Sequence, residues 1–298
     1  MSGPVVSFIV PTLDRPEELA RFLDSVATQR RADCEVIVVD QGEASVESLA
    51  RRYPGTTYLR SAERGLSRNR NLGLRSAAGS AVVFADDDCV LDGGYYAALQ
   101  DGLPRLRAAS AFGYGEVVTL EDGSPFVPTF RPHTGPVGTW YLDTLCSVGL
   151  VFPREILDRA GGFDERFGVG APCPAGEETD LLLRLVAAGV TGLYIRDLRV
   201  RHPRRARSPE LVSRYRRFGY GHGALARKHV GNRLFLVRFC YGLARTLAGL
   251  ALTGLLRRPA APLYRASVAG KLHGFLDFPN IERGTGDRSP APEAGARG

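Results

Sequence analysis

The hydrophobic pattern of the first half of the chain alternates between two periods. Short apolar runs end at turn residues or carboxylates, and apolar residues between them recur at helical spacing. The pattern predicts strands at residues 6–12, 34–40, 56–60 and 81–85, and helices at 17–29, 44–52 and 66–78. Such alternation implies right-handed crossovers and a largely parallel, doubly wound α/β sheet.

After about residue 110 the alternation loosens. A Pro- and Gly-rich stretch at 122–138 predicts a long loop. Strands are expected at 145–152 and 191–195, and helices at 154–163 and 177–188. We therefore expect an α/β domain over residues 1–205, a helical appendage over 206–280, and a disordered tail over 281–298.

Composition excludes several classes of protein. The hydrophobic content of 44% and the charged content of 24% are ordinary for a soluble globular chain. Five scattered cysteines without a C-x-x-C pair argue against a disulfide framework or a zinc site, and for a reducing compartment. The start, MSGPVVSFIVPT, lacks a basic region before its apolar run, so no secretory signal is expected.

Three adjacent carboxylates, Asp86 to Asp88, end the strand predicted at 81–85. No arginine or lysine lies within the next several residues to balance their charge. Ligands of open α/β sheets bind beyond the carboxyl ends of strands, and Asp14 and Asp40 fall on the same rim. Carboxylates suit Mg²⁺ or Mn²⁺, which would bridge nucleotide phosphates. The alternative is a solvated acidic turn before a helix that starts near Asp92.

Further segments favour the first interpretation. They are PTLDRPEEL (11–19), VVDQG (38–42), GLSRNRNLGLRSAAGS (65–80), GGFDERF (161–167) and PAGEETDLLLRLVAAG (174–189). In this order they resemble the inverting family 2 glycosyltransferases, from about Val6 to His202. The resemblance implies a GT-A fold, with a Rossmann-like nucleotide-binding half, a mixed central sheet and a C-terminal helical appendage.

The resemblance also implies which residues bind the donor and a divalent cation. The donor-binding positions are Pro11, Thr12, Asp14, Asp40, Arg70, Asn71, Asp86 and Asp87. The metal positions, for Mg²⁺ or Mn²⁺, are Asp88, Asp86 and His202. Two alternatives stay open. Asp14 could cap the following helix, and a lone histidine such as His202 is more often structural than a ligand.

The same resemblance implies a catalytic base at the start of the helix at 177–188. Glu178 matches the family's catalytic aspartate, and Glu177 is the alternative base. Either carboxylate could deprotonate an acceptor hydroxyl if its pocket raises the pKa modestly. Asp180 is expected to be structural. Trp140, in the long loop, could stack on an acceptor sugar or simply pack.

Positive charge is concentrated near the C-terminus. Residues 199–238 hold twelve Arg/Lys and one acid, a net +11 in a chain whose total is +7. No nucleic-acid-binding motif accompanies them, and a lipid-linked diphosphate or anionic headgroups fit better. The apolar run 234–256 contains Arg238 and Arg245 on one helical face. That pattern fits an interfacial helix or a helix packed on protein better than a membrane span.

These observations predict a non-processive, metal-dependent inverting glycosyltransferase at the inner face of a bacterial membrane. RYRRF (214–218) keeps only the end of the Q-x-x-R-W motif of processive synthases. The expected donor is a UDP-, GDP- or dTDP-sugar, and the expected acceptor is a glycan or a lipid-linked glycan. The alternatives are an inactive glycan-binding protein of the same fold and an arginine-rich nucleic-acid-binding protein.

Overall fold

The computed structural model describes residues 5–29, 33–133, 137–204, 210–256 and 258–284. The chain divides into two compact units, which are described separately. The first unit comprises Met1–Arg64, Arg68–Phe163 and Leu181–Arg205, and the second comprises Gly65–Ser67, Asp164–Asp180 and Ala206–Gly298. Most of the tail expected at 281–298 lies outside the described residues.

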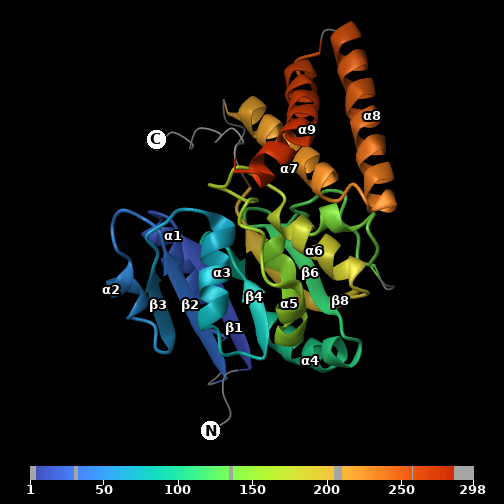
Figure 1. Cartoon of the computed structure of the whole chain (residues 1–298). Coiled ribbons are helices and arrows are strands. Elements are labelled where there is room, and N and C mark those ends of the chain that lie inside the picture. The colour runs from blue at the N-terminus through green and yellow to red at the C-terminus, as the bar shows by residue number, and fades with distance from the viewer. Residues whose placement is uncertain (1–4, 30–32, 134–136, 205–209, 257, 285–298) are drawn as a thin grey trace. The chain divides into compact units, whose positions relative to one another are not determined.

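The first unit is built on a mixed sheet, which confirms the α/β, GT-A-type fold (Figure 1). Its strand order is β3-β2-β1-β4-β7-β6-β8-β5. The strands are β1 (Val6–Thr12), β2 (Cys34–Asp40), β3 (Thr56–Arg60), β4 (Ala81–Phe84), β5 (Val90–Leu91), β6 (Phe112–Thr119), β7 (Leu150–Pro153) and β8 (Gly192–His202). The first four in spatial order run parallel, as does the β6–β8 pair. Strand β7 pairs antiparallel with β4 and β6, and β5 with β8. The sheet is therefore mixed, as the family resemblance implied, and less parallel than the alternation of elements alone predicts.

Helices flank this sheet, and all lie at predicted places except the one at 95–108, of which only a start near Asp92 was expected. They are α1 (Pro16–Ala27), α2 (Glu47–Ala50), α3 (Leu66–Ser76), α4 (Tyr95–Ala108), α5 (Arg154–Ala160) and α6 (Glu177–Ala187). Helix α1 shows why they form: Pro16 fits the first helical turn, and apolar residues at helical spacing bury one face. Leu19 and Phe22 of that face are fully buried, as is Phe8 in β1.

Strand β6 is the main element that the hydrophobic pattern did not predict. Its sequence, FGYGEVVT, contains two glycines, which weaken a strand signal. Gly115 is needed because a Cβ there would overlap the carbonyl oxygen of Leu198 in β8. The β6–β8 register shifts at this point, between Tyr114 and Glu116. The close approach of two backbones therefore explains a glycine that reads as a loop residue.

The second unit contains three long helices. They are α7 (Leu211–Lys228), α8 (Arg233–Leu255) and α9 (Ala261–Glu282). Helix α8 begins at an Asn232 cap, whose side chain accepts a hydrogen bond from the Phe235 amide at 3.1 Å. Helix α9 continues to Glu282, past the boundary expected at residue 280. The helical C-terminal region is thus present.

Candidate functional site

The predicted metal ligands gather at the carboxyl ends of β4 and β8. Asp86 and Asp88 follow β4, and His202 is the last residue of β8. The His202 Nε2 lies 3.5 Å from Asp88 Oδ1 and 3.8 Å from Asp86 Oδ2. The sheet therefore brings His202 to two carboxylates that lie more than a hundred residues before it in sequence.

Each carboxylate of the triplet has a different basic or polar partner. Arg70 Nη2 contacts Asp86 Oδ1 at 2.9 Å. Thr12 donates its hydroxyl to Asp87 at 2.8 Å, and Arg15 Nη1 lies 3.4 Å from Asp87. The same Arg15 atom lies 3.3 Å from Asp88 Oδ2. No arginine or lysine closely follows the triplet in sequence, and its cationic partners, Arg15 and Arg70, come from the parts of the chain before it.

Arg70 is fully buried rather than displayed on the rim. Its guanidinium contacts Asp86, donates to Ser147 Oγ at 3.0 Å, and stacks 5.3 Å from the Phe163 ring centroid. A fixed guanidinium fork of this kind orients the Asp86 carboxylate. The predicted contact of Arg70 with donor phosphates stays a prediction.

Two groups at the site have shifted pKa values. Burial raises the pKa of Asp87 to about 6, against the Thr12 hydrogen bond and the Arg15 charge, which lower it. Burial alone would lower the pKa of His202, but its hydrogen bond to Asp86 and the charge of Asp88 raise the pKa above the ordinary value. The ring of His202 also lies 4.5 Å from that of Phe126, centroid to centroid.

Asn71 holds the GGF segment. Its Nδ2 donates to the Phe163 carbonyl, and its Oδ1 accepts from the Phe163 amide, both at 2.9 Å. Gly161 and Gly162 precede this contact with φ of 71° and 79°, a region that favours glycine. A Cβ on Gly162 would lie 2.8 Å from Asn71 Oδ1. These contacts give a structural reason for the asparagine and the glycine pair.

The other predicted donor residues lie on β1 and β2. Asp40 is fully buried and accepts hydrogen bonds from the Gly42 and Val46 amides, and its pKa is lowered because these and two side-chain bonds outweigh burial. Its other partners are Tyr58 at 2.8 Å and Arg60 at 2.7 Å. A carboxylate with this many partners fixes the loop after β2.

Asp14 is exposed and adopts a left-handed backbone, with φ of 53°. Its Oδ1 accepts from the Glu43 amide at 2.6 Å. The cap position of α1 is Arg15, without a side-chain cap bond, so Asp14 is not the helix cap. Pro11 and Thr12 are buried within β1. Base or ribose contacts by Pro11, Thr12, Asp14 and Asp40 stay predictions.

The predicted catalytic carboxylates belong to the second unit. Glu177 and Glu178 occupy the first turn of α6, directly after Gly176 with φ of 99°. Glu177 is buried and Glu178 is half-buried. Asp180 is fully buried and pairs with Lys228 at 2.6 Å and with His229 at 2.8 Å. That network matches the structural position expected for Asp180.

The side chains at the triplet fit a hard divalent cation. Asp88 Oδ1 is buried and, among the described residues, has no hydrogen-bond partner. Such an atom beside Asp86 and His202 offers a ready oxygen ligand. Cys89 lies in the same cluster, but burial raises the pKa of its thiol well above the ordinary value. The described residues whose ligand atoms lie within 4.8 Å of one another are Asp88, Cys89 and His202, and Asp86 is not among them. A neutral thiol is a poor ligand for Mg²⁺ or Mn²⁺, so Asp88 and His202 are the better donors of this group, and ligation by Asp86 stays a prediction.

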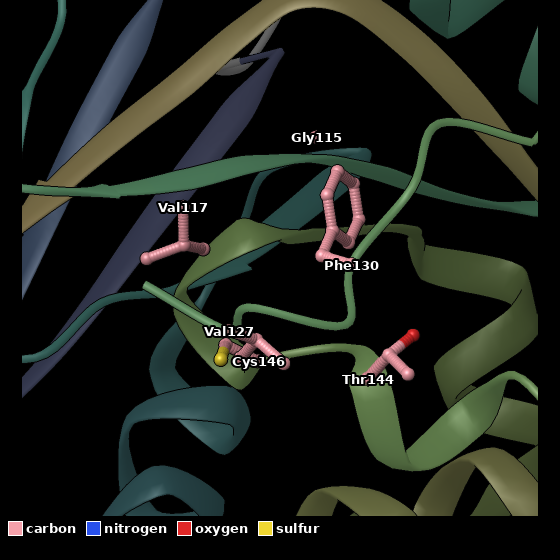
Figure 2. Close-up of a pocket in the computed structure, with 6 residues that line it drawn as sticks. All are labelled: Gly115, Val117, Val127, Phe130, Thr144 and Cys146. Carbon is pink, nitrogen blue, oxygen red and sulfur yellow. The ribbon is translucent and has the colours of Figure 1, made fainter. Parts of the chain in front are cut away.

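A small pocket lies beside β6 (Figure 2). Its lining is Gly115, Val117, Val127, Phe130, Thr144 and Cys146. Figure 2 shows only one hydroxyl group among these side chains, so the pocket has no group that could hold a cation or a phosphate. Trp140, on the loop that follows, is 46% exposed.

Sequence reasoning missed Arg15, Ser147 and Phe163. Arg15 stands next to Asp14 in the quoted PTLDR segment, so the motif itself held the signal. Phe163 is likewise part of GGFDERF, although nothing there indicates stacking on Arg70. Ser147 carries no sequence signal, because its contact with Arg70 depends on the turn before β7.

Comparison with known proteins agrees with this geometry. Residues 7–137, which include the acidic triplet and Arg70, match the family described as Glycosyl transferase family 2. An uncharacterized glycosyltransferase of Haemophilus influenzae is 33% identical over 86 residues, covering 28% of this chain and 29% of that protein. The N-terminal part of the chain is thus similar to glycosyltransferases.

Two further relatives are named for glycan synthesis. The O-antigen biosynthesis protein RfbC of Myxococcus xanthus is 26% identical over 237 residues, covering 67% of this chain and 17% of that protein. The GalNAc(5)-diNAcBac-PP-undecaprenol beta-1,3-glucosyltransferase of Campylobacter jejuni is 29% identical over 128 residues, covering 41% of this chain and 40% of that protein. The chain therefore spans less than half of the length of each of these three relatives.

Proposed function

We propose that this protein is a metal-dependent, inverting, non-processive glycosyltransferase. It would transfer a sugar from a UDP-, GDP- or dTDP-sugar to a glycan or lipid-linked acceptor. The observation that supports the proposal is the cluster of Asp86, Asp88 and His202, in which the two carboxylates lie inside the region that matches family 2.

In this proposal Asp88, Asp86 and His202 hold Mg²⁺ or Mn²⁺. The cation would supply positive charge to the leaving nucleoside diphosphate. Arg70 holds Asp86 in place, and Asn71 fixes the segment whose Phe163 ring covers Arg70. Thr12 and Arg15 orient Asp87.

Glu178 is the proposed general base, and Glu177 the alternative. A carboxylate would take the proton of the acceptor hydroxyl while that oxygen attacks the anomeric carbon opposite the leaving diphosphate. The half-buried side chain of Glu178 supports this order of preference, because Glu177 is buried in the first turn of α6. An attack from the opposite side inverts the anomeric configuration.

We propose that the acceptor is met at the inner face of a bacterial membrane. The relatives named for O-antigen synthesis and for an undecaprenol-linked acceptor support this location. The excess of basic residues in the C-terminal region is suited to anionic headgroups or to a lipid-linked diphosphate.

Product analysis tests the reaction and its base. Purified protein with Mn²⁺ is incubated with UDP-, GDP- and dTDP-sugars, and the anomeric configuration of any product is read by NMR. Glu178→Gln should lower kcat by roughly a hundredfold or more while nucleotide binding persists. Glu155→Gln, an exposed glutamate in the first turn of α5, is the matched control. Retained configuration, or full activity in Glu178→Gln, would overturn the proposed mechanism.

A further inference from the structure

Helix α8 has one face packed against α9, as Figure 1 shows for the two long helices of the second unit. The ring of Phe239 stacks on that of Phe275, with centroids 6.2 Å apart. Lys271 of α9 donates to Thr246 Oγ1 at 2.8 Å and to the Gly242 carbonyl at 3.2 Å. Burial lowers the pKa of Lys271, helped by the charge of Arg245. The contact between α8 and α9 therefore encloses a basic group, the ammonium of Lys271.

The opposite side of α8 is apolar and exposed. Six side chains, which we call the outer face, define it: Leu234, Val237, Tyr241, Leu247, Leu252 and Leu255. Their exposed fractions run from 47% for Leu247 to 82% for Leu255. Only 6% of the most apolar window of α8 is buried, and its mean hydropathy is 1.4. Among the described helices, α8 is the one long and apolar enough to cross a membrane.

We propose that the outer face of α8 docks on the surface of an anionic lipid bilayer, with the helix lying in the interface. An exposed apolar face of this length favours the boundary between headgroups and acyl chains. The contact between α8 and α9 argues against α8 as a membrane-spanning helix. If α8 crossed the membrane, α9 would have to enter the hydrocarbon with Arg265, Lys271 and Asp277.

The charge of α8 favours an anionic bilayer, rather than a second copy of the chain, as the partner of the outer face. Helix α8 carries Arg233, Arg238 and Arg245 and no acidic residue. Two paired copies of α8 would bring only like charges to the edges of their contact, where helix pairs normally place opposite charges. Anionic headgroups supply the missing negative charge. This inference deepens the proposed membrane location and does not depend on the metal cluster, which belongs to the first unit.

Vesicle co-sedimentation of the full chain tests the proposal. The lipids are phosphatidylcholine alone and phosphatidylcholine mixed with phosphatidylglycerol. We expect binding to the mixed vesicles, weakening at high salt, and release by alkaline carbonate. The variant Val237→Gln/Leu247→Gln should bind at least tenfold more weakly. Val169→Gln is the control, because Val169 is 57% exposed and Val237 58%. Circular dichroism checks that each variant is folded.

Four other results would contradict the proposal. If wild type and the double variant bind vesicles equally well, the outer face of α8 does not contact the bilayer. If wild type does not bind vesicles, the protein does not dock on a bilayer. Resistance to carbonate shows a span. A dimer that the double variant converts to a monomer, without vesicle binding, shows that a second copy covers the face. If wild type binds no nucleotide, the proposed reaction is refuted, whereas the conclusion from vesicle binding is unaffected.

Discussion

At the scale of single residues, Arg15 is the unusual member of the acidic cluster. Its guanidinium is 54% exposed, yet one nitrogen contacts both Asp87 and Asp88. A divalent cation on Asp88 would have to displace this contact or share the carboxylate with it. Under the proposed function, Arg15 would therefore be a counter-ion that competes with the metal.

Replacing Arg15 should strengthen metal binding. Arg15→Gln removes an exposed ion pair worth up to about 1 kcal/mol, so Mn²⁺ affinity should rise roughly two- to fivefold. Isothermal titration calorimetry with Mn²⁺ alone measures this affinity. Arg21→Gln, on the same helix and 52% exposed, should leave the affinity unchanged. Unchanged or weaker Mn²⁺ binding in Arg15→Gln would show that Arg15 does not compete.

Asn71 gives a second prediction at this scale. Asn71→Ala leaves the amide and carbonyl of Phe163 without their side-chain partners, which should cost about 1–3 kcal/mol of unfolding free energy. Urea unfolding measures the loss. Arg75→Ala, exposed on the same helix, should change stability by no more than about 0.5 kcal/mol. Equal stability of the two variants would refute the role of Asn71.

The sequence could indicate the ligands of the cluster but not their partners. Asp86 and Asp88 stand in a recognisable pattern at a strand end, and His202 ends a later strand. By contrast, the contacts of Arg70 with Ser147 and Phe163 join segments nearly a hundred residues apart. Such contacts follow from the order of strands in the sheet, which periodicity alone does not give.

At the scale of elements, α7 and α9 cross through two pairs of glycines. Gly219 and Gly223 of α7 face Gly270 and Gly274 of α9. A Cβ on Gly223 would overlap the Lys271 carbonyl oxygen, and one on Gly274 would overlap that of Tyr220. The backbones are therefore in direct contact, as in helix pairs that use small residues four apart.

Adding one methyl group at this crossing should separate the helices. Gly223→Ala should destabilise the second unit by about 1–3 kcal/mol, the usual cost of overpacking. Gly242→Ala is the control, because a Cβ there meets nothing within 4 Å and alanine should stabilise the helix by about 0.5–1 kcal/mol. Hydrogen exchange of α7 and α9 amides reports both changes, and equal protection in the two variants would contradict the crossing.

Most helices and parallel strands were predictable because their periodicity is strong. The α7–α9 crossing was not, although its four-residue glycine spacing is visible in GYGHG (219–223) and GKLHG (270–274). Arginines dominate the composition of α7 and draw attention to charge. Strand β6 escaped prediction for a related reason, since its glycines serve backbone contact and carry no apolar signal.

At the scale of the whole molecule, the sequence does not show that the two units interleave. Residues 164–180 and 65–67 cluster with the C-terminal helices rather than with the α/β unit around them in sequence. Within the second unit, Lys228 joins Asp164 and Asp180, each at 2.6 Å. The GGFDE and EETDL segments are thereby tied to α7.

Because of this network, the free energy of unfolding should decrease as the pH falls into the acid range. Burial alone would raise the pKa of Asp164, but Arg166 and Lys228 lower it well below its ordinary value. The stabilisation is therefore complete above the unfolded pKa, about 4, and is lost as the pH falls toward the folded pKa. Asp164→Asn should lower the free energy of unfolding at pH 7. The difference between the free energies of unfolding at pH 7 and at acid pH should therefore be smaller in this variant than in wild type. Asp158→Asn, an exposed carboxylate of α5, should keep the wild-type pH profile in urea titrations.

The central claim is that Asp88, with Asp86 and His202, holds a divalent cation that supports nucleotide binding. Calorimetric titration of UDP, GDP and dTDP into the protein, with Mn²⁺ and with EDTA, tests it most directly. We predict that at least one nucleotide binds in Mn²⁺, and that EDTA or Asp88→Asn weakens that binding at least tenfold. Equal binding with and without the cation, or none of any nucleotide, would contradict the account.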